Sequence, residues 1–492
     1  MKFNKLPLLI LLAFYTYLLA KPIDLSVTDI GRHLINGREI LHGNWEVLTF
    51  NFYSHTLPDQ QFVNHHWLTG VVFWLIYEAS GFLGLHLFHT VIAVINFTLL
   101  VLLLKKHGGA GVGFLLGVVA TLLMASRGEV RPETFGLLLH LNYLHFIFWV
   151  RKTGKFPGWA IAWLVTLQIF WTNFHISFVF GPFLFCWWWL TNLWEKNKPA
   201  EKLQKKLLLT WVMLGLVTMI NPNGLAGALT PLTILENYGY RVFENQTLWF
   251  LRNFYPGPII PLFYLISGVV VVGLVKFKNQ NSLFVKSLGV IGIVLGFVAL
   301  RNLPLFVIFT LPLLAEQLQL VIKKWRKKPL INIEQPRLVG GILLAGVFGA
   351  AVLLSQLHPV FGKRPPRHSG FGLIANQEKT IQALQQLPPG AKIFNNYDIG
   401  SMLIFTNYQN NFVFVDNRPE AYSAEFFQDH YIPIQEDEQQ WQQAQQAYNF
   451  DYLVIGHRDL TSWTQTFLAS RVKDPAWQLI YQDNFAVIFA AN

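Results

Sequence analysis

Charged residues are scarce in this chain of 492 residues, which is 13% Asp, Glu, Lys and Arg and 53% hydrophobic. A soluble protein of ordinary composition would be about a quarter charged. Cysteine is nearly absent, and the single Cys186 lies inside a hydrophobic run, which favours a packing role. The composition therefore excludes a disulfide framework and a cysteine-based zinc site.

The sequence also lacks the motifs of several enzyme classes. It contains no phosphate-binding Gly-rich loop with a Walker lysine, no His-Glu-x-x-His and no serine-nucleophile elbow. These absences argue against an ATP-driven pump and against a hydrolase of the soluble type.

Long apolar runs recur throughout residues 1–360. In lipid such runs must form helices, because a helix satisfies its own backbone hydrogen bonds without water. We therefore predict a polytopic α-helical membrane module of about eleven transmembrane helices. The expected spans are 5–20, 84–104, 111–126, 134–150, 158–174, 176–194, 207–221, 258–275, 283–300, 302–322 and 338–356.

The first span has a basic start followed by an apolar stretch, a pattern that a cleaved signal peptide shares. We prefer a retained span, because many further spans follow and no small-x-small cleavage site precedes Lys21.

The net charge of +11 is unevenly distributed along the chain. Residues 365–492 hold 7 Lys+Arg against 13 Asp+Glu, a charge of −6, which leaves +17 for the rest. The positive side chains gather in short loops near 151–155, 195–206 and 323–328, as orientation signals do. We therefore expect no nucleic-acid partner, cytoplasmic basic loops, and an integral plasma-membrane protein whose C-terminal domain is extracytoplasmic.

Two juxtamembrane amphipathic helices are expected in the first outer loop, residues 21–83. The tetrapeptide Ser-Val-Thr-Asp at 26–29 is a capping-box pattern, and an apolar face then predicts a surface helix to about His42. The apolar stretch 67–80 is only about 14 residues, too short to cross a bilayer comfortably. We expect that stretch to lie in the outer interface.

Residues 365–492 are predicted to form a small extracytoplasmic α/β domain after a hinge at Pro365-Pro366. Helices are expected at 377–387 and in the Gln-rich stretch 435–446. Strand-like runs occur at 392–394, 412–415, 452–455, 478–481 and 485–489.

Ionisable groups at membrane depth are costly, so their positions are informative. Under the predicted topology the unusual polar groups converge on the outer mouth of the bundle. They are Asp29, His33, His65, His66, Arg127, Glu129, Arg131, Glu133, Asn173, His175 and Arg301. Arg and His suit phosphate oxygens, and a carboxylate suits a substrate hydroxyl or a divalent cation. An apolar shell that opens outward with these groups fits an anionic lipid headgroup and a hydroxyl substrate.

The acidic candidates also have structural interpretations, which stay open from sequence alone. Asp29 would serve equally as the cap of its helix. Glu129 and Glu133 would neutralise the neighbouring Arg127 and Arg131 within one loop.

The same holds for the basic candidates. Arg131 and Arg301 would also snorkel to lipid phosphates. The adjacent His65 and His66 would also be ordinary interface histidines, and two histidines without a third ligand are a weak metal signal.

The chain resembles the GT-C superfamily of polyprenyl-phosphate-sugar-dependent membrane glycosyltransferases. The stretch 28–43, TDIGRHLINGREILHG, resembles the first juxtamembrane helix of that superfamily, and 64–84 resembles the second. Residues 127–135, RGEVRPETF, stand where the superfamily places another acidic loop residue. A bacterial branch similar in layout to protein O-mannosyltransferases and aminoarabinose transferases matches further short segments. These are 171–181, 221–224, 393–405 and 413–422.

Two features depart from that branch. His66 occupies a position where the branch often has a glutamate, and no compact Asp-x-Asp occurs in the first outer loop. The first departure removes one candidate acid. The second leaves a divalent cation, Mg²⁺ or Mn²⁺, open as a cofactor, with no metal ligand predicted.

The resemblance implies a glycosyltransferase that moves a sugar from a polyprenyl-phosphate-linked donor to an extracytoplasmic hydroxyl. The acceptor would be a glycan, a lipid or a protein. Asp29 would be the base or would orient the acceptor, assisted by Glu129 or Glu133. The residues expected to bind substrate are His33, His65, His66, Arg131, Asn173, His175 and Arg301. The rival hypothesis is a non-catalytic module that binds, assembles or transports a lipid-linked saccharide.

Within the predicted tail domain, Asp416 and Arg418 have two interpretations. They would help to select the acceptor, or they would form a structural turn pair.

Overall fold

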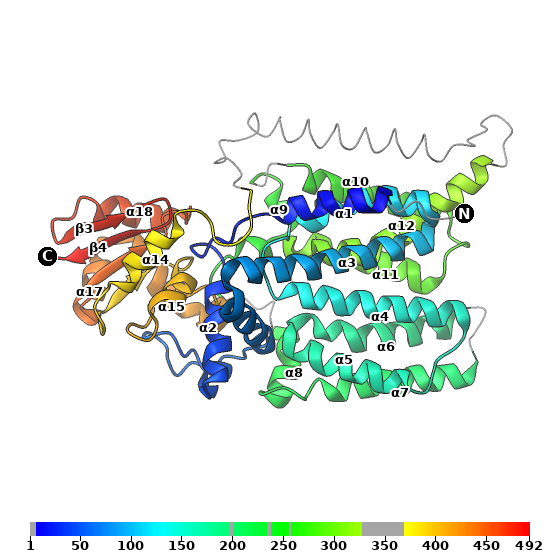
Figure 1. Ribbon diagram of the computed structural model, residues 1–492, viewed down its shortest axis with the longest axis horizontal. Helices are drawn as coiled ribbons and strands as arrows, with labels where there is room; N and C mark the ends of the chain where they lie inside the picture. Colours follow the sequence, from blue (N-terminus) through cyan, green and yellow to red (C-terminus); the bar gives the residue numbers. More distant parts are fainter. Residues whose placement is uncertain (1–5, 196–199, 234–237, 255–256, 327–368) are drawn as a thin grey trace.

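The computed structural model describes residues 6–195, 200–233, 238–254, 257–326 and 369–492. A bundle of helices makes up one end of the elongated molecule, and a domain with a small β-sheet, which carries the C-terminus, makes up the other (Figure 1). Helix α2 lies between the two (Figure 1). The expected span at 338–356 and the expected hinge at Pro365-Pro366 lie outside the described residues.

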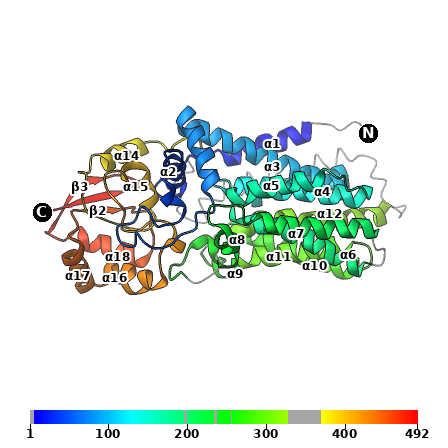
Figure 2. The same ribbon diagram turned by 90° about the horizontal axis from the view of Figure 1, so that it is seen from below.

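The bundle consists of apolar helices that run side by side along its length (Figure 2). They are α1 (Leu6–Leu19), α3 (Trp67–Ala125), α4 (Glu133–Thr153), α5 (Ala160–Phe174), α6 (Phe180–Trp194), α7 (Glu201–Val217), α10 (Ile259–Lys276), α11 (Leu283–Val298) and α12 (Leu303–Arg326), with the shorter α8 (Gly224–Thr233) and α9 (Leu248–Leu251). The helical prediction is confirmed, and α8 is a helix that the sequence analysis did not anticipate.

Four described segments are long and apolar enough to cross a bilayer: Trp67–Ala125, Ile176–Trp194, Ile259–Lys276 and Leu300–Trp325. Helices α1, α5 and α11 are apolar but shorter. The described residues thus confirm a helical architecture with segments able to cross a bilayer, whereas the number of about eleven spans is not confirmed.

Helix α3 contains two breaks at glycine. Gly81 has φ 64° and Gly109 has φ 78°, a backbone conformation that residues with a Cβ rarely adopt. The first break separates the segment 67–80 from the next helical stretch, and the second falls between the expected spans 84–104 and 111–126. Both boundaries agree with the sequence prediction.

Helix α2 (Ile30–Leu41) begins later than the capping-box pattern predicts. Ser26 does not cap it, because the Ser26 hydroxyl donates to Asp24 Oδ1 at 2.6 Å. The helix is also not a surface helix, since most of its residues up to Gly37 are buried. A Cβ on Gly37 would lie 2.1 Å from the Gly70 carbonyl oxygen of α3. Glycine therefore allows α2 to pack directly on the backbone of α3.

The tail domain contains a four-stranded sheet in the order β1-β2-β4-β3. Strands β1 and β2 are parallel, and the other two pairings are antiparallel. The strands are β1 (Ile393–Asn395), β2 (Tyr452–Ile455), β3 (Trp477–Gln482) and β4 (Val487–Ala491). The helices are α14 (Gln377–Gln385), α15 (Gly400–Asn407), α16 (Ile432–Glu436), α17 (Glu438–Tyr448) and α18 (Ser462–Arg471).

Four of the five expected strands and both expected helices occur in the tail. The expected strand at 412–415 is wrong. Val413 instead forms a single parallel bridge with Ser54 of the first loop, and its backbone N–H donates to the Tyr53 carbonyl at 2.9 Å. The apolar run 412–415 thus attaches the tail to the first loop rather than extending the sheet.

Candidate active site

Asp29 stands at the N-cap position of α2, but its side chain makes no capping hydrogen bond. Its Oδ2 accepts a hydrogen bond from His33 Nε2 at 3.3 Å and lies 3.9 Å from the Arg32 guanidinium. Its Oδ1 is buried and has no hydrogen-bond partner among the described residues. The Asp29 side chain therefore does not cap the helix, and the acceptor capacity of Oδ1 is not used by the described residues.

The surroundings of Asp29 fix its charge. Burial alone would raise the pKa of Asp29, but the hydrogen bond from His33 and the charges of Arg131 and Arg32 outweigh burial and hold that pKa well below its ordinary range. Burial and the Arg32 charge lower the pKa of His33, so His33 is neutral at pH 7 and donates to Asp29. Asp29 is consequently anionic at physiological pH. Such a carboxylate is a firm hydrogen-bond acceptor but a weak base, because general-base efficiency follows the pKa.

Four histidine rings lie together beside Asp29. The centroid of the His66 ring is 5.6 Å from that of His33, 4.2 Å from that of His65 and 4.9 Å from that of His175. Burial lowers the pKa of His65 to about 3. His175 Nδ1 accepts a hydrogen bond from the Ser177 backbone N–H at 3.1 Å, so its proton is on Nε2. The histidines that the sequence analysis singled out therefore form one cluster.

Two arginines and three glutamates form an ion-pair network at the same end of the bundle. Arg127 donates to Glu133 at 2.5 Å and to Glu244 at 2.6 Å. Arg131 donates to Glu129 at 3.0 Å and to Glu244 at 2.7 Å. The pairing of Glu129 and Glu133 with arginines agrees with their structural interpretation, while their catalytic role stays a prediction.

Glu244 is the group in this network that sequence reasoning missed. Burial opposes its ionisation, but Arg131, Arg127 and Arg301 together lower its pKa. Its neighbour Asn245 accepts a hydrogen bond from Arg301 at 2.9 Å, so Arg301 is joined to the network. The segment around Glu244 therefore ties the loop 127–133 to Arg301.

A carboxylate of the tail domain faces the same cations. Glu420 lies in the short turn Pro419–Ala421, and burial raises its pKa while Arg32, Arg418 and Arg301 oppose that rise. Arg32 is 5% exposed, and its Nε has no hydrogen-bond partner among the described residues. Sequence reasoning missed both Glu420 and Arg32, although each stands in a segment that it had quoted.

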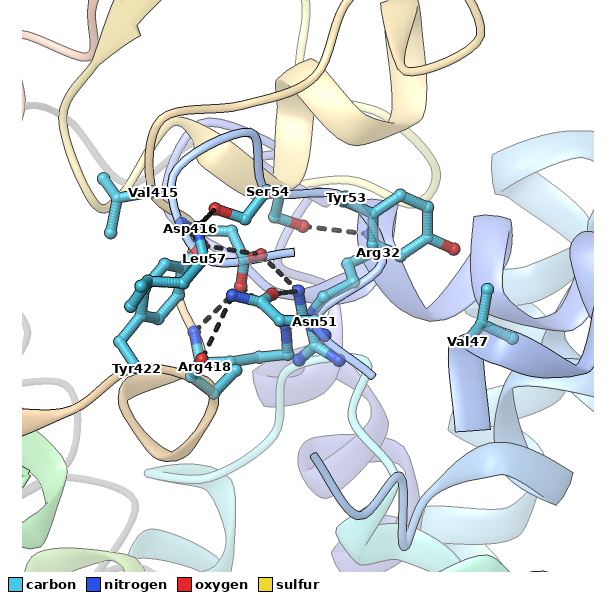
Figure 3. Close-up of polar contacts among 12 residues, drawn as sticks. Arg32, Val47, Asn51, Tyr53, Ser54, Leu57, Val415, Asp416, Arg418 and Tyr422 are labelled. Carbon is cyan, nitrogen blue, oxygen red and sulfur yellow. Dashed lines mark hydrogen bonds and ion pairs between the residues drawn. The ribbon is translucent and has the colours of Figure 1, made fainter. Parts of the chain in front are cut away.

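A buried ion pair holds the turn of Glu420 in place (Figure 3). Arg418 donates to Asp416 through Nε at 2.7 Å and through Nη2 at 2.5 Å, and it donates to Asn51 of the first loop at 2.6 Å. Asn51 in turn donates to the Ala421 carbonyl at 3.0 Å. Because the side chains of Asp416 and Arg418 are 0% and 1% exposed, they do not contact an acceptor. Their expected role in acceptor selection is corrected, and they form the structural pair.

Asn173 also has a structural explanation. Its Oδ1 accepts a hydrogen bond from Trp67 Nε1 at 2.7 Å, and its Nδ2 donates to the carbonyls of Ile169 and Ile220. The buried side chain thus joins the start of α3 to the ends of α5 and α7. These bonds agree with a structural role, while the expected contact of Asn173 with substrate stays a prediction.

The site does not fit a divalent cation. No group of three or more His, Cys, Asp or Glu side chains in the described parts of the chain has the arrangement of a metal site. Asp29 Oδ1 is an oxygen ligand in type, but Arg32 and Arg131 surround it with positive charge. Mg²⁺ or Mn²⁺ would require several oxygen ligands free of competing cations.

Comparison of the fold with solved structures gives matches over almost the whole chain. Oligosaccharyltransferase AglB from Archaeoglobus fulgidus, in complex with an inhibitory peptide and a dolichol-phosphate, has a TM-score of 0.65 at 9% identity. That match covers 100% of this chain and 75% of AglB. ArnT from Cupriavidus metallidurans, in the apo state, has a TM-score of 0.54 at 13% identity and covers 98% of this chain and 97% of ArnT.

Both proteins are polyprenyl-phosphate-dependent membrane glycosyltransferases of the GT-C superfamily. The chain therefore has the GT-C fold, as its sequence resemblance predicted, and its long apolar helices support a location in a membrane. No protein-family model and no curated protein sequence matches the chain.

Proposed function

We propose that the protein is a GT-C glycosyltransferase that transfers a sugar from a polyprenyl-phosphate-linked donor to an acceptor hydroxyl outside the cytoplasm. The fold supports the reaction class, and the AglB structure holds both a dolichol-phosphate and an inhibitory peptide. The observation that carries the proposal is Asp29, an ionised carboxylate with a buried, unpartnered oxygen beside arginines and neutral histidines.

The reaction is a displacement at the anomeric carbon of the donor. The acceptor oxygen forms a bond to that carbon while the bond to the phosphate oxygen breaks, and the phosphate leaves with the electron pair. Arg32, Arg301 and His175 would hold the phosphate oxygens by charge-assisted and neutral hydrogen bonds. Placing such donors where negative charge develops lowers the barrier most.

Asp29 would accept the hydrogen bond of the acceptor hydroxyl on Oδ1 and aim the acceptor oxygen at the anomeric carbon. Its low pKa suits this orienting role better than storage of the proton. The departing phosphate and the Glu420 carboxylate, whose pKa is raised, are the stronger proton acceptors in this arrangement. His33, His65 and His66 would lie beside the bound substrate. Arg131 would keep Asp29 ionised.

Asp29→Asn is the direct test of this role. Purified protein in lipid is incubated with radiolabelled polyprenyl-phosphate sugars and a panel of glycan, lipid and peptide acceptors. We expect the variant to lose at least about two orders of magnitude in transfer rate, as mutation of positioned groups does. Asp59→Asn, which changes an exposed carboxylate of the same loop, is the matched control and should keep its rate. Full transfer by Asp29→Asn would refute the assignment.

A non-catalytic lipid-linked saccharide binder is the second candidate. The pairing of Glu129, Glu133 and Glu244 with arginines favours it, because it leaves those three carboxylates neutralised by structure. The same incubation separates the candidates. A binder would retain the labelled donor and would release no free polyprenyl phosphate, whichever acceptor is added.

A further inference from the structure

A small internal cavity of about 20 Å³ lies beneath the ion-pair network, between α1, α3 and the loop that leads into α4. His89, Ala93 and Asn96 of α3 line it, together with Arg127 and Thr134. A space of roughly 10–15 Å³ by this measure is enough for one water molecule. The cavity therefore has the size of a single-water site.

The polar lining of the cavity is unsatisfied by the protein itself. His89 Nδ1, Asn96 Oδ1, Arg127 Nε and Thr134 Oγ1 are all buried, and none has a hydrogen-bond partner among the described residues. Buried polar atoms without partners are rare and costly. Four such atoms around one cavity indicate that a ligand satisfies them together.

The hydrogen-bonding types of these atoms match a water molecule. Arg127 Nε can only donate, and the Thr134 hydroxyl can donate as well. Asn96 Oδ1 accepts, because the Asn96 amide nitrogen already donates to the Thr134 carbonyl at 2.8 Å. His89 Nδ1 accepts when its ring proton is on Nε2. Two donors and two acceptors are what one water needs to complete its four hydrogen bonds.

Ions fit the same lining less well. A cation would meet the charged Arg127 guanidinium, which supplies no lone pair. Glu129, Arg131 and Glu133 also line the cavity, but both carboxylates are already paired, Glu133 with Arg127 and Glu129 with Arg131. An anion would be opposed by Asn96 Oδ1 and His89 Nδ1, and the common inorganic anions are larger than a water molecule.

We propose that this cavity binds one structural water molecule, which bridges α3 and α4 through Asn96 and Thr134 and completes the hydrogen bonding of Arg127. The terminal nitrogens of Arg127 already contact Glu133 and Glu244. The water takes the remaining Nε–H and thereby fixes the plane of the guanidinium. The proposal does not depend on the proposed enzymatic activity.

A cryo-EM or crystal structure of the full chain in lipid, at a resolution that shows ordered waters, is the first test. We expect one isolated peak within hydrogen-bonding distance of Asn96 Oδ1, Arg127 Nε and Thr134 Oγ1. A map that shows ordered waters elsewhere at this depth but no peak in the cavity would overturn the proposal.

Thermal unfolding of two variants provides an independent test. Thr134→Val removes a hydroxyl that has no protein partner, and Ala93→Val fills the cavity with apolar volume. In a dry cavity Thr134→Val would leave the unfolding midpoint unchanged or raise it, so this variant decides between the two cases, whereas Ala93→Val also adds the cost of overpacking. With a bound water, both lower it, because the remaining polar atoms lose their partner.

Thr121→Val is the matched control for Thr134→Val. Thr121 is equally inaccessible on α3, but its hydroxyl donates to the Gly117 carbonyl of its own helix at 2.9 Å. We expect the midpoint to fall more in Thr134→Val than in Thr121→Val. A raised or unchanged midpoint in Thr134→Val refutes the bound water.

Discussion

The buried ion pair between Arg418 and Asp416, both in the tail domain, is predicted to contribute strongly to the stability of the tail where Arg418 also donates to Asn51 of the first loop. In Arg418→Met the Asp416 carboxylate stays fully buried without its counter-charge. Removal of one partner from a buried pair costs about 3–5 kcal/mol. Asp416 keeps a hydrogen bond from the Arg418 backbone N–H at 3.1 Å, so we expect the low end of that range, about 3 kcal/mol.

The measurement is urea-dependent cleavage of the tail by a protease added in a short pulse, with the protein in detergent. The cleaved fraction at each urea concentration reports the free energy of unfolding of the tail. Adding Asp416→Asn to Arg418→Met should recover more than half of the loss, because the second change removes the unpaired charge. The two changes are thus strongly non-additive.

Arg458→Met is the matched control for Arg418→Met. Arg458 pairs with a carboxylate of the first loop, Asp24, whereas Arg418 pairs with Asp416 of the tail itself, and the Arg458 side chain is 34% exposed. Solvent-exposed pairs contribute at most about 1 kcal/mol. Equal losses in Arg418→Met and Arg458→Met, or full additivity of the Arg418 and Asp416 changes, would refute the reasoning from burial.

Two further predictions concern the tail and the first loop. Burial and Asp459 raise the pKa of Asp398 from 3.8 to about 7, so the folded tail retains a proton that the unfolded chain releases. Its stability should fall as the pH rises from about 4 to about 7, and Asp398→Asn should reduce that slope in urea titrations at several pH values, the raised pKa of Glu420 leaving a part of it. Gly37→Ala places a methyl against the Gly70 carbonyl and should destabilise the fold by about 1–3 kcal/mol in thermal unfolding. Gly111→Ala, with open space around it, should not.

The helices of the bundle were predictable because their signal is local. An apolar run in lipid must form a helix, because only a helix satisfies its own backbone hydrogen bonds there. The positions of the long apolar helices therefore follow from the sequence. The breaks at Gly81 and Gly109 were predictable for a similar reason, since glycine and short apolar lengths mark them within the chain. The strand at 412–415 failed because an apolar β-branched run indicates extended structure but not its partner. Here the partner is the first loop.

Most residues of the site were predictable from the sequence, whereas the ion pairs that they form with one another were not. A sequence shows that Arg127 and Glu133 are close along the chain, but Glu244, the shared partner of Arg127 and Arg131, is 117 residues away from Arg127. Its one local signal was a carboxylate in an extramembrane stretch that also carries Arg241 and Arg252. Coulombic interaction depends on distance in space, so only the packed bundle decides which carboxylates are neutralised.

The same principle explains why Asp29 differs from the other carboxylates at the mouth. Glu129, Glu133 and Glu244 each contact an arginine at 3.0 Å or less, and such pairs leave little capacity for another ligand. Asp29 has positive neighbours but only a long contact to Arg32, so its charge is stabilised while Oδ1 stays unpaired. The Asp29 side chain is 27% exposed, but its buried Oδ1 lacks a hydrogen-bond partner among the described residues, which costs free energy in the free protein. That cost is offset when a substrate hydroxyl donates to Oδ1, which makes Asp29 the position where acceptor binding and charge stabilisation are coupled.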